Sequence, residues 1–230
     1  MHGLFRSILA IGLLSLLGAC AEPVSRHEAP RILAMGDSLL SWNRATGRSV
    51  AHGVEGLLNE PVVDRSVPGA HVIYALPISG SLGLKIDRQY RAGDWDWIIL
   101  NGGGNDLWLG CGCGACDGRM GRMLTPDGAS GAIAASVFRL RATGARVIYL
   151  GYLRSPGRGS PIEHCRDDGD ELERRLARLA GRDPGITFVP IGDMVPYGDR
   201  SYHSFDMIHP SAKASAEIAA RVVSVIRSGE

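Results

Sequence analysis

Short apolar runs alternate with amphipathic segments along most of this chain of 230 residues. Five runs have the length and composition of buried strands, and they occupy residues 31–35, 61–67, 95–101, 146–153 and 186–191. Other segments repeat apolar residues at the three- and four-residue intervals of helices, over residues 50–58, 129–143, 167–180 and 212–226. Near-continuous apolar runs such as Ile98-Ile99-Leu100 predict parallel strands that are covered on both faces.

This alternation predicts an α/β protein with a three-layer α/β/α sandwich. A doubly wound, five-stranded parallel sheet would lie between two layers of helices. In such sheets, functional side chains collect at the carboxyl ends of the strands, where the winding reverses. The chain length and the lack of a polar or Pro-rich linker predict one domain, over residues 30–228.

The first residues of the chain predict a targeting segment. An apolar run over residues 8–17 is too short to span a membrane but suits the core of a signal peptide. The motif Leu-Gly-Ala-Cys that ends at Cys20 resembles the bacterial lipobox, whose cysteine is acylated. We therefore expect a signal peptide within residues 1–21 and a periplasmic protein with a lipid anchor at Cys20. Cleavage after Ala21 with plain secretion is one alternative, and an uncleaved anchor is another.

The remaining cysteines are even in number and fit an oxidising compartment. They are Cys111, Cys113, Cys116 and Cys165. Two disulfides are expected, and the sequence does not choose among the three possible pairings. A metal site that includes His164, next to the last cysteine, is one alternative. A redox role for the C-x-x-C motif that starts at Cys113 is the other, although this motif lies in a Gly-rich loop rather than at a helix start.

Charge excludes some classes of partner. The chain has 25 basic and 24 acidic residues, for a net charge of +1. This balance gives no electrostatic support for binding nucleic acid or an acidic membrane surface. We expect no nucleic-acid partner, and we expect membrane attachment only through a lipid at Cys20.

Four short motifs carry the candidate chemistry. In chain order they are Gly36-Asp37-Ser38-Leu39, Gly69, Gly103-Gly104-Asn105-Asp106 and Asp206-Met207-Ile208-His209-Pro210. The first three follow predicted strands, so they should meet at one edge of the sheet.

Together these motifs supply the parts of a serine esterase. A serine hydroxyl becomes a useful nucleophile when a base such as His209 removes its proton during attack on a carbonyl carbon. Asp206, three residues earlier, can bond the other ring nitrogen and stabilise the protonated ring. The backbone N–H groups of Ser38 and Gly69 and the side-chain amide of Asn105 can stabilise the negative oxygen of the intermediate.

The aspartates beside these residues are expected to act by hydrogen bonding. Asp37 and Asp106 adjoin Ser38 and Asn105, and an ordinary carboxylate titrates near pH ~4, too low for an efficient base at neutral pH. His203, with Asp199 four residues before it, is the one rival base. We expect His203 to be a loop histidine without a catalytic role.

Each motif alone has a simpler interpretation. Gly-Asp-Ser is also typical of a loop that caps a helix, and Asn-Asp and Pro-Gly pairs are typical of turns. The joint occurrence of all four motifs, with three of them at strand ends, favours catalysis.

In this order the motifs resemble those of the SGNH (GDSL-type) hydrolase superfamily, and the resemblance extends from Ile32 to the final helix. It implies a flavodoxin-like fold. It also implies that Ser38 is the nucleophile, that Gly69 and Asn105 complete the oxyanion hole, and that Asp206 and His209 complete the triad. The superfamily includes lipases, thioesterases, arylesterases and glycan deacetylases, so the resemblance does not select a substrate.

We therefore expect a cell-envelope serine ester hydrolase that acts through an acyl-enzyme on small to medium carboxylic esters. One alternative is an O-acetyl deacetylase of polysaccharide or peptidoglycan, and another is a non-catalytic lipoprotein that binds glycan or lipid. We expect a small-molecule or glycan ester as the partner, and neither a cofactor nor a catalytic metal. The Gly- and Cys-rich residues 110–128 are expected to form a long connection at the rim of the site.

Overall fold

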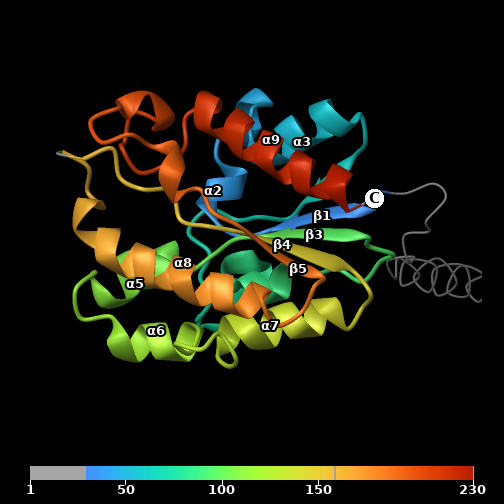
Figure 1. Cartoon of the computed structure of the whole chain (residues 1–230), viewed down its shortest axis with the longest axis horizontal. Helices are drawn as coiled ribbons and strands as arrows, with labels where there is room; N and C mark the ends of the chain where they lie inside the picture. The colour runs from blue at the N-terminus through green and yellow to red at the C-terminus, as the bar shows by residue number, and fades with distance from the viewer. Residues whose placement is uncertain (1–29, 158, 230) are drawn as a thin grey trace, which may run out of the picture.

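The computed structural model describes residues 30–157 and 159–229, which form a three-layer sandwich (Figure 1). The strands of the central sheet are β1 (Ile32–Met35), β2 (Val62–Asp64), β3 (Trp97–Leu100), β4 (Arg146–Leu150) and β5 (Ile186–Val189). They run in the order β2-β1-β3-β4-β5, and every pair is parallel. The predicted five-stranded, doubly wound parallel sheet is therefore confirmed.

Helices cover both faces of the sheet (Figure 1). One layer contains α2 (Ser38–Ser41), α3 (Val50–Leu58) and α9 (Ala212–Ser228). The other contains α5 (Gly104–Cys111), α6 (Asp117–Met123), α7 (Ala132–Arg141) and α8 (Arg166–Ala180). Shorter helical turns occupy Arg44–Thr46, Pro77–Ser79, Gly80–Leu84, Ile86–Gln89, Glu163–Cys165, Gly192–Met194 and Arg200–Tyr202.

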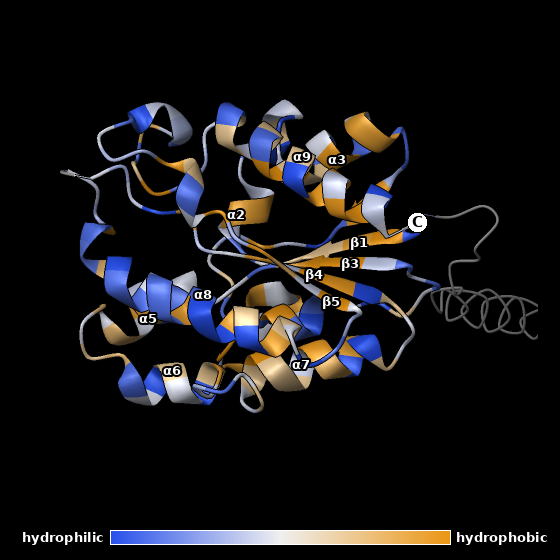
Figure 2. Cartoon of the chain, in the orientation of Figure 1, coloured by the Kyte–Doolittle hydropathy of each residue, from blue (hydrophilic) through white to orange (hydrophobic). Residues whose placement is uncertain are grey.

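The core has two halves because successive side chains of a strand point to opposite faces of the sheet. On β1, Leu33 and Met35 pack with α5 to α8, whereas Ile32 and Ala34 pack with α3 and α9. The same alternation continues along β3 and β4. Figure 2 shows hydrophobic residues along the strands and a largely hydrophilic surface on α8. Burial on both faces explains why the strands read as continuous apolar runs.

Several element boundaries differ from the predicted ones. The second strand, expected over 61–67, is only Val62–Asp64, and its side chains are half-buried because β2 lies at the edge of the sheet. The fourth strand, expected over 146–153, ends at Leu150. Beyond it the N–H of Tyr152 donates to Glu173 Oε1 at 2.9 Å rather than to a neighbouring strand.

The prediction of a long connection over residues 110–128 is wrong, because this segment holds the end of α5 and all of α6. Two disulfides hold the segment: Cys111–Cys116 links the end of α5 to the start of α6, and Cys113–Cys165 links it to the residue before α8. The predicted pair of disulfides is thus confirmed, and its pairing is now defined.

The disulfide pairing also tests the two other interpretations of the cysteines, a metal site and a redox pair. Ligand atoms of Cys113, His164 and Cys165 lie within 4.8 Å of one another, but both sulfurs are consumed by their shared disulfide. They offer no thiolate to a metal ion. Cys113 and Cys116 bond to different partners, so the interpretation of their C-x-x-C motif as a redox pair is wrong.

We predict that the two disulfides contribute unequally to stability. Replacing Cys113 and Cys165 together by alanine opens a link between residues 52 apart, whereas replacing Cys111 and Cys116 opens one that spans only 5. Chain-entropy arguments give a loss of about 4 kcal/mol in the free energy of unfolding for the first pair and about 2 kcal/mol for the second. Urea unfolding of both double variants checks this order; an equal loss, or the reverse order, would contradict it.

The predicted signal peptide and the lipid anchor at Cys20 lie outside the described residues. Within residues 30–157 and 159–229, no helix has the length and apolar character needed to cross a bilayer.

Candidate active site

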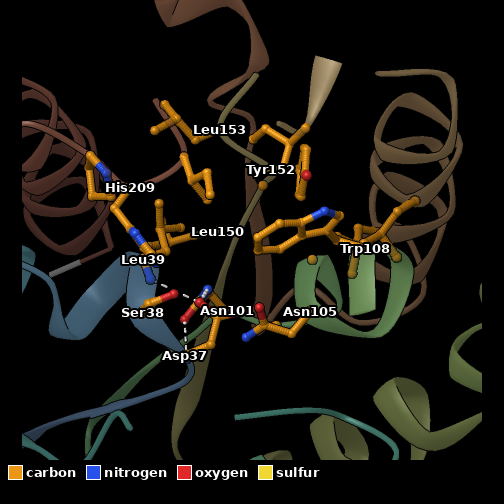
Figure 3. Close-up of a pocket in the computed structure, with 18 residues that line it drawn as sticks. Asp37, Ser38, Leu39, Asn101, Asn105, Trp108, Leu150, Tyr152, Leu153 and His209 are labelled. Carbon is orange, nitrogen blue, oxygen red and sulfur yellow. Dashed lines mark hydrogen bonds between the residues drawn. The ribbon is translucent and has the colours of Figure 1, made fainter. Parts of the chain in front are cut away.

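The candidate site lies at the carboxyl edge of the sheet, beside β1 and β3, where the winding reverses. A pocket at this edge has a volume of about 600 Å³, counting its opening to solvent. Ser38 follows β1, Asn105 follows β3, and His209 precedes α9, and all three line the pocket (Figure 3). The fold therefore brings together residues that are far apart in the sequence.

Ser38 is the first residue of α2, and the residue before it fixes how the chain enters that helix. Asp37 caps the helix by accepting the N–H of Leu39 at 2.9 Å. Asn101, at the end of β3, donates to the Asp37 carboxylate at 2.7 Å and accepts the Asp37 N–H at 3.0 Å (Figure 3). Burial raises the pKa of Asp37, although the hydrogen bonds from Asn101 and Leu39 act in the opposite direction. Asp37 thus holds the segment that carries Ser38.

A second buried amide holds the residue before Asp37. Gln89 accepts the N–H of Gly36 at 2.6 Å and donates to the Gly36 carbonyl at 2.8 Å. Gly36 has no room for a side chain, since a Cβ would lie 1.8 Å from Asn101 Oδ1. Sequence reasoning missed Gln89 and Asn101. For Asn101 a signal existed, because an amide at the end of a buried apolar strand needs a hydrogen-bond partner.

Potential oxyanion donors remain available. In the described part of the chain, the N–H groups of Ser38 and Gly69 have no protein acceptor. Asn105 Nδ2 donates one hydrogen to the Ala70 carbonyl at 2.9 Å, which orients the amide and leaves its second hydrogen free. Gly69 itself is not among the residues that line the pocket. Its φ of +75° favours glycine, and a Cβ there would meet no protein atom within 4 Å.

Asp106 links the segment that follows Gly69 to α5. Its buried carboxylate accepts the N–H groups of Val72 at 2.8 Å and Ile73 at 3.0 Å, and Arg119 lies 3.7 Å away. Burial raises the pKa of Asp106, although these partners favour the ionised form. The carboxylate therefore ties the segment that follows Gly69 to the helix that carries Asn105.

His209 and Asp206 form a local pair. His209 Nδ1 lies 2.6 Å from Asp206 Oδ2, and Asp206 Oδ1 accepts the N–H groups of Ile208 and His209, each at 3.0 Å. Burial favours the neutral acid, but these hydrogen bonds outweigh it and lower the pKa of Asp206. With Nδ1 engaged, Nε2 is left for proton transfer. No hydrogen bond joins Ser38 to His209 within the described residues, and such bonds are often long before substrate binds.

Trp42 contacts the imidazole directly, a role that the sequence did not reveal. Its ring stacks on His209 with centroids 3.7 Å apart and an interplanar angle of 9°. The next residue, Asn43, donates to the Pro210 carbonyl at 3.0 Å. The segment that follows Ser38 is therefore joined to the segment that carries His209 by a stack and a hydrogen bond.

We predict that Trp42→Ala lowers kcat about 3- to 10-fold, because the stack positions the imidazole. Trp42→Phe, which keeps an aromatic face, should recover most of this loss. Steady-state hydrolysis of a p-nitrophenyl ester by the two variants measures the effect. An unchanged kcat in the alanine variant would contradict the prediction.

The position of His203 does not suit a catalytic base. It is buried, it does not line the pocket, and burial lowers its pKa. Asp199 accepts the N–H of Ser201 at 2.8 Å instead of pairing with His203. The rival base is therefore not supported.

Comparisons with known proteins agree with this geometry. The GDSL-like lipase/acylhydrolase family matches residues 34–216. Solved structures with a similar fold include a lipase/acylhydrolase from Enterococcus faecalis, with a TM-score of 0.60 and 14% identity over 86% of this chain and 96% of that chain. Another is Est24, a carbohydrate acetylesterase from Sinorhizobium meliloti, with a TM-score of 0.58 and 13% identity over 87% of this chain and 100% of that chain.

A third is Est2A, an acetyl xylan esterase from Butyrivibrio proteoclasticus, with a TM-score of 0.53 and 16% identity over 90% of this chain and 65% of that chain. No curated protein matches the sequence. The family match covers most of the chain and includes every motif described above, so the protein belongs to the GDSL-like lipase/acylhydrolase family of SGNH hydrolases.

Proposed function

We propose that this protein is a serine ester hydrolase that acts through an acyl-enzyme on small to medium carboxylic esters. The observation that carries the proposal is the 2.6 Å contact between His209 and Asp206, on a loop that lines the same pocket as Ser38. It gives the imidazole a fixed orientation and leaves one ring nitrogen for the serine proton.

The first half of the reaction forms the acyl-enzyme. Ser38 Oγ attacks the ester carbon while His209 Nε2 takes the hydroxyl proton, and Asp206 stabilises the resulting imidazolium. Free N–H groups of Ser38, Gly69 and Asn105 bind the oxyanion of the tetrahedral intermediate. Collapse of the intermediate breaks the bond to the alcohol oxygen, which leaves with the proton from His209.

The second half of the reaction hydrolyses the acyl-enzyme, with water as the nucleophile. His209 removes a proton from water, the hydroxide adds to the acyl carbon, and the same donors stabilise the second oxyanion. Collapse then releases the carboxylic acid and returns the proton to Ser38.

The lining of the pocket supports a modest acyl group. Much of its wall is apolar, with Leu39, Leu150, Leu153, Ile162, Leu172 and Leu176 around the polar groups. The volume of about 600 Å³ counts solvent space at the open mouth, so the enclosed part of the pocket is smaller. Long chains would extend beyond such a space, so we propose acetyl to medium-chain esters as substrates.

Hydrolysis of p-nitrophenyl esters from acetyl to palmitoyl tests the proposal. Protein purified without residues 1–20 should show turnover that falls steeply beyond medium chains. The absence of turnover at every chain length, with folded protein, would contradict the proposed activity. A maximum at palmitoyl would contradict the proposed size of the acyl group.

Asn105→Ala tests the oxyanion donors. Because the amide hydrogen is expected to bind the oxyanion more strongly than the ester carbonyl, its loss should lower kcat by about two to three orders of magnitude with a smaller effect on KM. Asn59→Ala, which removes an exposed amide outside the pocket lining, is the matched control and should leave kcat unchanged. An unchanged kcat for Asn105→Ala would remove this residue from the oxyanion hole.

We also propose that the protein acts in the periplasm, held by a lipid at Cys20. The sequence around Cys20 and the use of Cys111, Cys113, Cys116 and Cys165 in disulfides both support an oxidising compartment outside the cytoplasm. Labelling with a radioactive fatty acid, compared with a Cys20→Ala variant, tests the anchor. Equal labelling of both proteins would contradict it.

A further inference from the structure

Arg119, on α6, lies beside the carboxylate that connects the oxyanion donors, although it belongs to none of the sequence motifs. Its guanidinium is 3.7 Å from Asp106 Oδ1, and the two side chains are 20% and 0% exposed, respectively. Within residues 30–157 and 159–229, no other carboxylate pairs with Arg119, and its buried Nε has no hydrogen-bond partner. Arg119 therefore acts on Asp106 as a charge rather than through a hydrogen bond.

The fold provides a place for this guanidinium. Asp106 and Gly110 are one turn apart on α5, so they lie on the same face of the helix. A Cβ at Gly110 would lie 2.3 Å from Arg119 Nε, so the absence of a side chain there leaves room for the guanidinium. The Cys111–Cys116 disulfide joins the end of α5 to the start of α6, and Arg119 lies in the first turn of α6. The glycine and the disulfide together place Arg119 against α5.

The ionised form of Asp106 depends on its partners. Burial raises the pKa of Asp106, and four partners act in the opposite direction: Ile73, Val72, His71 and Arg119. A guanidinium keeps its charge at any pH at which the protein is folded. Hydrogen bonds to an ionised acceptor are about twice as strong as those to a neutral one. By favouring the ionised carboxylate, Arg119 strengthens the bonds that Asp106 accepts from the backbone.

These backbone bonds hold the oxyanion donors in place. The two N–H groups that Asp106 accepts follow shortly after Gly69. The carbonyl of Ala70, in the same segment, accepts a hydrogen from the Asn105 amide at 2.9 Å. A shift of this segment would move the Gly69 N–H and the Asn105 amide together. A misplacement of about 1 Å at a reacting group can cost about 100-fold in rate.

We propose that Arg119 is a positioning residue for the oxyanion hole, an inference that rests on the proposed ester hydrolysis at Ser38. Its charge keeps Asp106 ionised, and this carboxylate fixes the segment after Gly69 against the helix that carries Asn105. Arg119 does not line the pocket, so it acts without touching the ester. The disulfide-bonded connection between α5 and α6 thereby contributes to stabilisation of the transition state.

Arg119→Met tests the charge, since methionine keeps much of the apolar stem and removes the guanidinium. Hydrolysis of p-nitrophenyl butyrate should show a kcat about 10- to 100-fold lower, with KM little changed. Arg119→Lys keeps a positive charge and should recover most of this loss. Arg122→Met, at an exposed arginine of the same helix, is the matched control and should leave kcat unchanged. An unchanged kcat in Arg119→Met, or an equally large loss in Arg119→Lys, would overturn the proposal.

A double-variant cycle separates positioning from a general loss of folded protein. In an Asn105→Ala background, Arg119→Met should lower kcat by a clearly smaller factor than in the parent, because one of the donors that it positions is absent. The same factor in both backgrounds would mean that Arg119 supports only the fold as a whole, and it would overturn the proposal.

Amide exchange measures the positioning without any substrate. Hydrogen exchange followed by NMR should be about 10-fold faster at Val72 and Ile73 in Arg119→Met than in Arg122→Met, with no change along β3. Equal rates in the two variants, or a uniform increase that includes β3, would overturn the proposal. If the wild-type protein hydrolyses no ester, the proposed function itself fails, and the exchange rates still decide whether Arg119 holds this segment.

Discussion

Ser38→Ala is expected to reduce ester turnover by about four to six orders of magnitude, because the substitution removes the oxygen that we propose forms the acyl-enzyme. The loss should appear in kcat, since the pocket that binds the ester keeps its shape. Steady-state hydrolysis of p-nitrophenyl butyrate, with the variant purified on fresh resin to exclude wild-type enzyme, measures the effect.

Two controls make this result interpretable. Ser81→Ala removes a serine hydroxyl outside the pocket lining and should leave turnover unchanged. Thermal unfolding of Ser38→Ala should match that of the parent protein, because no protein group bonds to the Ser38 hydroxyl in the described part of the structure. A folded Ser38→Ala protein that retains activity would remove Ser38 from the mechanism.

Asp206→Asn should lower kcat by about three to four orders of magnitude. An amide at this position cannot stabilise the imidazolium as a carboxylate does, and it can donate to Nδ1, which would place the ring proton on the wrong nitrogen. Asp199→Asn is the matched control, because this nearby carboxylate bonds to its own turn and lies 3.9 Å from the Lys213 amine. Similar activity of the two variants would show that the contact between Asp206 and His209 has no catalytic role.

The same substitution has a predictable effect on acid stability. Hydrogen bonds hold the pKa of Asp206 below its ordinary value in the folded state. The carboxylate therefore adds to stability above pH ~4, where it is ionised in the unfolded chain, and this contribution is lost as pH falls through the lowered folded value. Unfolding free energies measured in urea between neutral pH and pH ~3 should fall less steeply for Asp206→Asn than for the parent. An equal slope would contradict this assignment.

The sheet was predictable because a strand that is buried on both faces consists almost entirely of apolar residues. β1, β3 and β4 lie inside the sheet and read as apolar runs. The edge strand β2 was predicted too long, because its half-buried side chains mark the ends of the strand less clearly. Helices α5 and α6 were missed because glycines and cysteines obscure the helical period there, and disulfides compensate for the weak propensity.

The residues of the candidate site were also predicted only in part. Ser38, Asn105 and His209 were found because each belongs to a short motif, and the fold places all three on one pocket. Gln89 and Trp42 act through contacts between distant segments, which neither composition nor spacing can reveal. Both hold a catalytic segment in place, and many different residues could do that in another chain.

The order of the catalytic parts along the chain has a consequence for biogenesis. Ser38 follows the first strand, whereas His209 lies just before α9, the last helix. A ribosome or an export channel releases the amino-terminal end first, so the nucleophile emerges long before its base. The proposed esterase activity can therefore arise only after the last helix has packed against α3 and brought His209 to the pocket that Ser38 lines.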